Sequence, residues 1–189
     1  MFLDSFSPGE FTLQDLLNRI RSCQACTDLP RGPRPIVQGN ANSKIVIISQ
    51  APGTKAHESG IPFQDASGER LRTWLNLTEE QFYNPDLVAI MPMGFCYPGK
   101  AKSGDLPPRK LCSQLWHESF LSHLHNRRLT LLVGNHSQNA YLEAKKKTAT
   151  ESIKSWRDFG PDFIPLPHPS PLNNIWLSKN LWFESEVMP

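Results

Sequence analysis

The stretch KIVIISQAPGTKAHESGIPFQDASGERLRTWL, residues 44–75, decides the fold that we expect for this chain. It begins with an apolar, β-branched run at residues 45–48, which is typical of a strand buried on both faces of a sheet. A turn at Ala51-Pro52-Gly53 follows, then a polar loop, and then a helix that we expect to begin near Ser67, capped by its hydroxyl group. In an open α/β sheet this order places the loop at the carboxyl end of a strand, where ligands bind. The stretch therefore predicts a ligand site at this loop.

Length, charge and hydropathy narrow the class of protein. The chain has 189 residues, enough for one α/β domain with a substantial core, and we expect residues 1–189 to form a single domain. Its formal net charge of +2 neither requires nor excludes nucleic acid, because the placement of charges matters more than their sum. No run of about 18 apolar residues and no signal-peptide pattern occurs. We therefore expect a soluble cytoplasmic protein with no membrane contact.

Further apolar patterns extend the alternation of strands and helices along the chain. Three more strands are expected where short apolar runs recur, at residues 87–91, 129–133 and 163–166. Helices are expected where apolar residues repeat with helical spacing, at residues 11–22, 77–85, 108–125, 137–145, 153–159 and 175–184. This alternation predicts an α/β fold of three layers, α/β/α, with a central four-stranded, largely parallel sheet.

Four cysteines, Cys23, Cys26, Cys96 and Cys112, form the pattern C-x₂-C … C-x₁₅-C. In a cytoplasmic protein such a set points to metal or redox chemistry before disulfides. Two centres need four thiolates in a shell closed to water: a structural Cys₄ zinc site and an iron–sulfur cluster. The alternative is four unrelated cysteines that are simply buried. Spacing alone does not separate zinc from iron–sulfur.

In several motifs the sequence resembles the uracil-DNA glycosylase superfamily, and within it the iron–sulfur (family 4/5-like) branch, as a divergent member. Q-A-P-G … G-I-P-F-Q-D-A-S-G, residues 50–68, is similar to that branch's E-A-P-G … G-x-P-F-x-G-x-A-G. The order of the four cysteines resembles that of its cluster ligands. H-P-S-P-L, residues 168–172, looks like the second motif of other uracil-DNA glycosylases, and G-N-H-S-Q, residues 134–138, resembles a G-x-H-x-Q that they carry.

This resemblance implies a cofactor. Cys23, Cys26, Cys96 and Cys112 would hold a [4Fe-4S] cluster, with structural Zn as the alternative. The cluster would be structural, would tie the N-terminal helix to the segment between the last two cysteines, and would need no redox change.

The resemblance also assigns roles around a flipped base. Gln50 and Ala51 would lie on the base-facing turn, and Phe63 would stack on the base. His168 would donate a hydrogen bond to a carbonyl oxygen of the leaving base as negative charge develops there.

Two residues near the C-terminus are expected to contact DNA. Ser170 and nearby backbone amides would hold phosphates. Leu172 would fill the space that the flipped base leaves in the stack, as apolar side chains do when a duplex is opened.

Two positions depart from the family pattern. An acidic residue is expected at one of the two positions that Gln50 and Ala51 occupy, and neither residue carries a negative charge. An Asn that reads the edge of uracil is expected where this chain has Pro92, which offers no hydrogen-bond donor.

Polar residues of the central loop could compensate for the missing carboxylate. His57 and Glu58 are candidates for positioning water at the sugar carbon, and Asp65 lies beyond them, provided that they reach the cleft. The alternative for these residues is a solvated loop surface. The Lys145-Lys146-Lys147 run is expected to be a solvated helix end, with phosphate binding as the alternative.

These features lead to one expected function and two alternatives. We expect a monomeric DNA repair glycosylase that flips a deaminated or damaged base of DNA (uracil-type) and hydrolyses its N-glycosidic bond. The first alternative is a non-catalytic, glycosylase-like iron–sulfur protein that binds DNA through the same cleft. The more distant alternative is a hydrolase of free nucleosides, which would have no use for Leu172.

Overall fold

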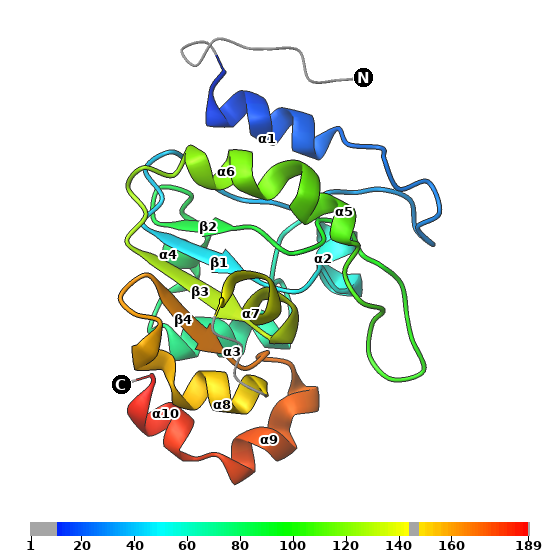
Figure 1. Ribbon diagram of the computed structural model, residues 1–189. Coiled ribbons are helices and arrows are strands. Elements are labelled where there is room, and N and C mark those ends of the chain that lie inside the picture. Colours follow the sequence, from blue (N-terminus) through cyan, green and yellow to red (C-terminus); the bar gives the residue numbers. More distant parts are fainter. Residues whose placement is uncertain (1–10, 144–147, 189) are drawn as a thin grey trace.

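A four-stranded sheet in which every strand is parallel to its neighbours forms the centre of the computed structural model (Figure 1), which describes residues 11–143 and 148–188. The strands are β1 Ile45–Ile48, β2 Val88–Ile90, β3 Leu129–Val133 and β4 Phe163–Leu166. Their order is β2-β1-β3-β4, so β1 and β3 are the inner strands. The predicted four-stranded sheet is confirmed, and it is entirely parallel.

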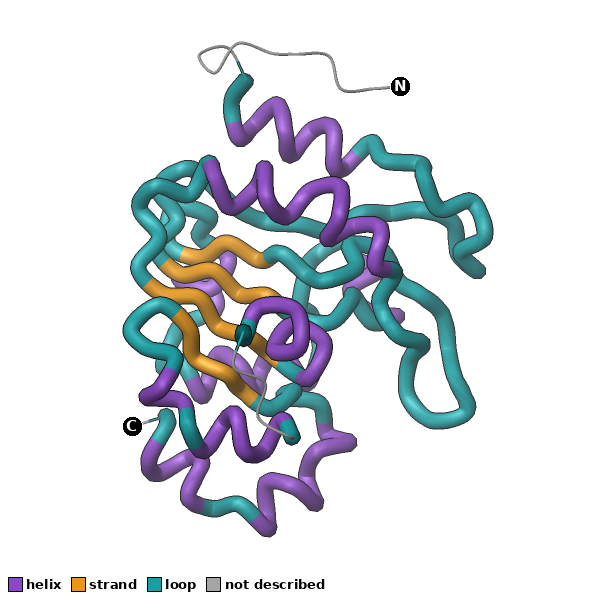
Figure 2. Tube along the Cα trace, viewed as in Figure 1, coloured by secondary structure: helices purple, strands orange, loops and turns teal. Residues whose placement is uncertain are grey.

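Helices cover both faces of this sheet, as Figure 2 shows. One face carries α1 Leu13–Arg21, α6 Glu118–Ser122 and α7 Asn135–Tyr141. The other face carries α3 Ala66–Trp74, α4 Glu79–Tyr83, α8 Ala149–Lys154 and α10 Trp182–Glu186. The expected three-layer α/β/α architecture is therefore confirmed.

Side chains of β1 alternate between the two halves of the core. Val46 and Ile48 pack in the cluster under α1 and α6, whereas Ile47 packs in the cluster on the opposite face, and all three are fully buried. Alternate residues of a strand point to opposite faces. A strand covered on both sides must therefore be apolar throughout, which is why the run at residues 45–48 was readable from sequence.

Several helices differ from their predicted extents. The segment expected to be one helix at residues 108–125 consists of α5 Lys110–Cys112, a π-helical stretch at Ser113–His117, and α6. The residues expected to form a polar loop after β1 contain a short helix, α2 Thr54–Ser59, that turns Ala56 and His57 into the protein. Six residues offer too few turns for a periodic apolar pattern, so sequence reasoning had no signal for this helix.

The C-terminal helices are also rearranged. The expected helix at residues 175–184 is broken into α9 Asn174–Lys179 and α10. Asn180 breaks it, since its backbone leaves the helical region (φ −131°, ψ 54°) and its side-chain amide donates to the Trp176 carbonyl (2.8 Å) and accepts from the Trp182 indole (3.1 Å). The Lys145-Lys146-Lys147 run lies outside the described residues. Across the described ranges, no helix combines the length and the hydropathy that crossing a bilayer requires.

A buried histidine, His117, forms a hydrogen bond to the chain just after β2. His117, in the π-helical stretch, is 4% exposed; its Nδ1 lies 2.6 Å from Tyr141 Oη and its Nε2 lies 3.0 Å from the Pro92 carbonyl oxygen. A carbonyl can only accept, so Nε2 carries the proton and Nδ1 accepts from the tyrosine hydroxyl. Burial lowers the pKa of His117 to about 4, and the Pro92 carbonyl opposes this shift only in part. The imidazole is therefore neutral in the folded protein near pH 7.

This geometry predicts a pH dependence of stability. The unfolded chain takes up a proton at His117 below about pH 6.5, whereas the folded protein does so only near its lowered pKa of about 4. The contribution of His117 to the free energy of unfolding is therefore present above pH 6.5 and is lost as the pH falls through this interval. Substitution His117→Phe should remove that part of the acid sensitivity, and should cost about 1–3 kcal/mol at pH 7 because the buried Pro92 carbonyl and the half-buried Tyr141 hydroxyl lose their hydrogen bonds.

Denaturant unfolding at pH 7.5 and pH 5 measures both effects. The exposed His125 provides a matched control, and His125→Phe should keep the wild-type difference between the two pH values. An unchanged pH difference in His117→Phe would contradict the assignment of this sensitivity to His117.

Candidate functional site

A cleft with a volume of about 840 Å³ opens at the carboxyl end of the sheet. Its walls come from five places: the turn after β1, helix α2, the 62–67 segment that leads into α3, the loop after β2, and the loop after β4. Among the lining residues are Gln50, Ala51, Phe63, Pro92, His168 and Leu172. Residues as far apart in sequence as Phe63 and His168 thus line one cavity, as the sequence predicted for the strand exits.

The backbone of Phe63 lies directly on helix α3. Phe63 has a left-handed conformation (φ 56°), and a side-chain carbon at Gly68 would lie 1.7 Å from the Phe63 carbonyl oxygen. Only glycine permits this approach. The Tyr83 hydroxyl donates to the Pro62 carbonyl (3.0 Å), and the Phe63 ring meets Phe82 edge-on with 6.0 Å between ring centroids. The Phe63 ring at the cleft wall is therefore positioned by its contact with the buried Phe82.

His168 is fixed in one tautomer by its own loop. The Ser170 backbone N–H donates to His168 Nδ1 (3.2 Å), so the neutral ring carries its proton on Nε2. Gly134, at the end of β3, has a φ of +89° that favours glycine, and a side-chain carbon added there would make van der Waals contact with His168 at 3.4 Å. Burial lowers the pKa of His168, and the charges of Asp65 and Asp105 oppose that shift. His168 therefore presents a neutral Nε2–H donor near pH 7.

Arg70 of α3 holds the loop that carries His168. Its Nη1 donates to the carbonyls of Pro169 (3.1 Å) and Ser170 (3.2 Å), and its Nη2 donates to Asn174 Oδ1 (2.8 Å). Helix α3 also contacts the Phe63 backbone through Gly68, so one helix positions both the Phe63 wall and the His168 wall of the cleft. Sequence reasoning did not single out Arg70, because a helical arginine carries no signal of a partner about 100 residues away.

Ser170 and Leu172 lie at the mouth of the cleft. The Ser170 hydroxyl accepts from the Leu172 backbone N–H (3.2 Å) and begins the 3₁₀ turn Pro171–Asn173. Leu172 is 70% exposed, as are Ile175 (70%) and Leu181 (74%) in the helices that follow. The loop after β2 approaches this side chain, since a side-chain carbon added at Gly104 would lie 3.5 Å from Leu172 Cδ1.

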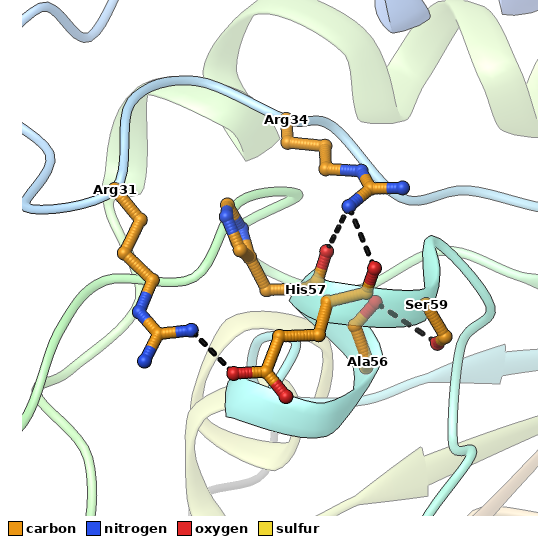
Figure 3. Close-up of polar contacts among 6 residues, drawn as sticks. Arg31, Arg34, Ala56, His57 and Ser59 are labelled. Carbon is orange, nitrogen blue, oxygen red and sulfur yellow. Dashed lines mark hydrogen bonds and ion pairs between the residues drawn. The ribbon is translucent and has the colours of Figure 1, made fainter.

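Glu58 reaches the cleft, whereas His57 is not among its lining residues. Figure 3 shows their environment: Arg31 pairs with the Glu58 carboxylate (2.6 Å), and the Arg34 guanidinium donates to the backbone carbonyls of His57 and Glu58. His57 is 8% exposed, and its Nδ1 has no hydrogen-bond partner among the described residues. Burial lowers the pKa of His57, with Arg34 and Arg31 adding to the effect and Glu58 opposing it. Arg31 and Arg34 are thus both engaged with α2.

A different residue from the one expected caps α3. Asp65 Oδ1 accepts from the backbone N–H groups of Ser67 (2.9 Å) and Gly68 (3.0 Å), so the cap is Asp65 and not the Ser67 hydroxyl. The prediction failed because serine and aspartate are equally good caps and only two residues separate them.

The four cysteines lie close enough to act on one another electrostatically. The pKa of Cys96 is raised to about 12, mainly by burial and also by Cys112, Cys26 and Cys23, while the hydrogen bond from the Arg34 backbone N–H opposes the shift. Burial likewise raises the pKa of Cys112, with Cys26 and Cys23 adding to it, while the Phe95 N–H donates to its sulfur (3.4 Å). Among the described residues, no three His, Cys, Asp or Glu side chains are placed to hold one metal ion.

The contact between Gly68 and Phe63 generates a prediction. Gly68→Ala should displace the Phe63 backbone, because the new carbon would overlap its carbonyl group, and should cost more than about 2 kcal/mol of folding free energy. Thermal unfolding measures the loss. Gly32, where an added carbon meets nothing within 4 Å, provides a matched control, and Gly32→Ala should cost about 1 kcal/mol for its backbone conformation alone. Equal losses in the two variants would show that the close approach is unimportant.

Comparison with protein families places this cleft in a known superfamily. The family model described as "Uracil DNA glycosylase superfamily" matches residues 36–189, which include the whole sheet and every wall of the cleft. On this match over most of its length, and on the parallel sheet with its cleft at the strand exits, the chain belongs to the uracil-DNA glycosylase superfamily.

Proposed function

We propose that this protein is a DNA repair glycosylase that hydrolyses the N-glycosidic bond of a deaminated or damaged base after flipping it into the cleft. One observation carries the proposal: an aromatic ring, Phe63, and a neutral histidine donor, His168, line the same cavity in a chain of this superfamily. A base is flat and carries oxygen or nitrogen acceptors at its edge, so it matches such a pair of groups.

The two groups divide the work on the base. Phe63 offers a face on which the extruded base stacks, and the core holds that face in position. When the bond between C1′ and the base nitrogen breaks, the electron pair leaves with the base. His168 Nε2–H then stabilises the negative charge on a carbonyl oxygen of the base, and its donor needs no reorientation because Ser170 fixes the tautomer.

DNA binding involves the mouth of the cleft in this proposal. Leu172, 70% exposed, inserts where the flipped base leaves the stack. Ser170 and the surrounding backbone amides hold phosphates. Lys55 and Lys100 also line the cleft, and lysines there favour a polyanion.

We further propose that Cys23, Cys26, Cys96 and Cys112 hold a [4Fe–4S] cluster, with structural zinc as the alternative. The donor set fits either group: four half-buried thiols supply the sulfur ligands, and Cys23 and Cys26 raise the pKa of both Cys96 and Cys112, so a bound cation is what would stabilise these two as thiolates. The amide hydrogen bond to Cys112 resembles those that tune cluster sulfurs. When bound, the group supplies a cross-link between the segment after α1 and the chain around α5.

A non-catalytic DNA-binding protein is the second candidate. The observation that favours it is the absence of an acidic side chain at Gln50 and Ala51, together with the absence of a donor at Pro92. Such a protein would bind lesion-containing DNA tightly, with an affinity that falls as salt rises, and would release no base.

A panel of duplexes tests the proposed function. Oligonucleotides carrying uracil, hypoxanthine, xanthine or oxidised bases are incubated with protein purified without oxygen, and abasic sites are detected by alkaline cleavage. We expect release of at least one base, and His168→Ala should reduce its rate by about 10²–10³-fold. His168→Gln, which keeps an N–H donor, should be less impaired than His168→Ala. Salt-sensitive binding without release of any base would favour the second candidate.

Metal analysis tests the cofactor. Protein purified without oxygen should be brown and should contain iron and sulfide, and Cys96→Ser should lose both together with thermal stability. Stoichiometric zinc without colour would support the alternative. Wild-type metal content in Cys96→Ser would remove Cys96 from the ligand set.

A further inference from the structure

We propose that Asp105 is the catalytic carboxylate of this cleft, which accepts a proton from the attacking water and faces the positive charge on the sugar. This inference rests on the proposed function and assigns a residue for the chemistry at the sugar. Cleavage of an N-glycosidic bond builds positive charge at C1′ and needs water activated beside it, and a carboxylate serves both needs. Neither Gln50 nor Ala51 can supply one.

Asp105 belongs to the long loop between β2 and α5, and this loop projects from the body of the fold in Figure 1. Lys100 and Asp105 pair across this loop as an isolated antiparallel bridge. The Ala101 N–H donates to the Gly104 carbonyl (3.1 Å), and the Leu106 N–H donates to the Gly99 carbonyl (2.8 Å). These bonds turn the loop back so that Gly104, Asp105 and Leu106 line the cleft.

The carboxylate of Asp105 points to the turn after β1. A side-chain carbon at Gly53 would lie 3.6 Å from Asp105 Oδ2 and 3.8 Å from Asp65 Oδ2. Two carboxylates from separate loops therefore face one point, immediately beyond Ala51, and Gly53 leaves that point free of a side chain. Both also act electrostatically on His168, which places them near the group proposed to hold the leaving base.

Of the three acidic side chains in the cleft, Asp105 is the one least committed elsewhere. Glu58 is paired with Arg31 at 2.6 Å, and Asp65 uses Oδ1 to cap α3. The Asp105 side chain is 31% exposed, and its Oδ1 is buried without a hydrogen-bond partner among the described residues. The same oxygen, Oδ1, lies 3.3 Å from Nζ of Lys100 in an ion pair, but the lysine side chain is 71% exposed and the solvent weakens that attraction.

The step balances without a further reactant. The bond between C1′ and the base nitrogen breaks, and its electron pair leaves with the base, where His168 meets the charge. A water oxygen forms the new bond to C1′, and one of the water protons passes to the Asp105 carboxylate. The products are the base anion and an abasic site; the anion takes up a proton from the solvent, and Asp105 returns its proton to the solvent.

A charged analogue of the sugar tests Asp105 directly. Duplex DNA carrying a pyrrolidine abasic-site analogue, whose ring nitrogen is protonated near pH 7, imitates the positive sugar, and a tetrahydrofuran analogue is its neutral counterpart. Wild-type protein should bind the pyrrolidine duplex about tenfold or more tightly than the tetrahydrofuran duplex. Asp105→Asn should abolish that preference while leaving tetrahydrofuran binding essentially unchanged. On a lesion that the wild type processes, Asp105→Asn should slow base release by about 10²-fold or more.

Two matched variants complete the test. Asp86→Asn removes the same charge from an exposed position before β2, so it corrects for the general effect of charge on DNA binding and should keep the preference. Asp65→Asn keeps a good helix cap and should retain most of the preference.

A wild type that binds both duplexes equally, a preference that persists in Asp105→Asn, or a larger loss in Asp65→Asn would overturn the assignment. A preference that depends on Asp105, in a protein that releases no base from any lesion, would support the placement of Asp105 beside the sugar but contradict both its catalytic role and the proposed function.

Discussion

The parallel arrangement of the four strands is the constraint on which the rest of this structure depends. Parallel strands all end at the same edge, so the segments that leave β1, β2 and β4 must meet there. That geometry brings Phe63, Asp105 and His168 from three separate parts of the chain to one cleft. These three residues lie outside the strands, and the sheet determines where the segments that carry them leave it.

Close packing behind the cleft keeps these exits in place. The Phe63 backbone rests on Gly68, and Arg70 clamps the His168 loop, so that α3 positions both groups. His117 holds the Pro92 carbonyl at the end of β2 from the opposite layer. A left-handed Phe63 and a buried neutral histidine are locally unfavourable, and the surrounding contacts stabilise them. Such features concentrate where a protein must fix a geometry for binding or chemistry.

Much of this could be predicted from sequence, because the signals were local or repeated. Fully buried strands such as β1 must be apolar throughout. The proline- and glycine-containing motifs around Phe63 and His168 indicate turns and loops that follow strands. Contacts between distant segments left no such signal. Nothing in the sequence relates Arg70 to Ser170, or Asp105 to Gly53, since those pairs depend on how loops fold back. His57 looked like a polar loop residue, but a helix of six residues turns it inward. The roles assigned to the cysteines stay predictions.

The central claim is that a flipped base lies between Phe63 and His168. A crystal structure of the protein bound to a duplex tests it most directly, with the target nucleotide fluorinated at the 2′ position so that its glycosidic bond resists hydrolysis. The account predicts a base outside the helix, stacked on the Phe63 ring, with an oxygen at hydrogen-bond distance from His168 Nε2. A target base that remains stacked in the duplex, or that occupies a site not lined by Phe63, would contradict it.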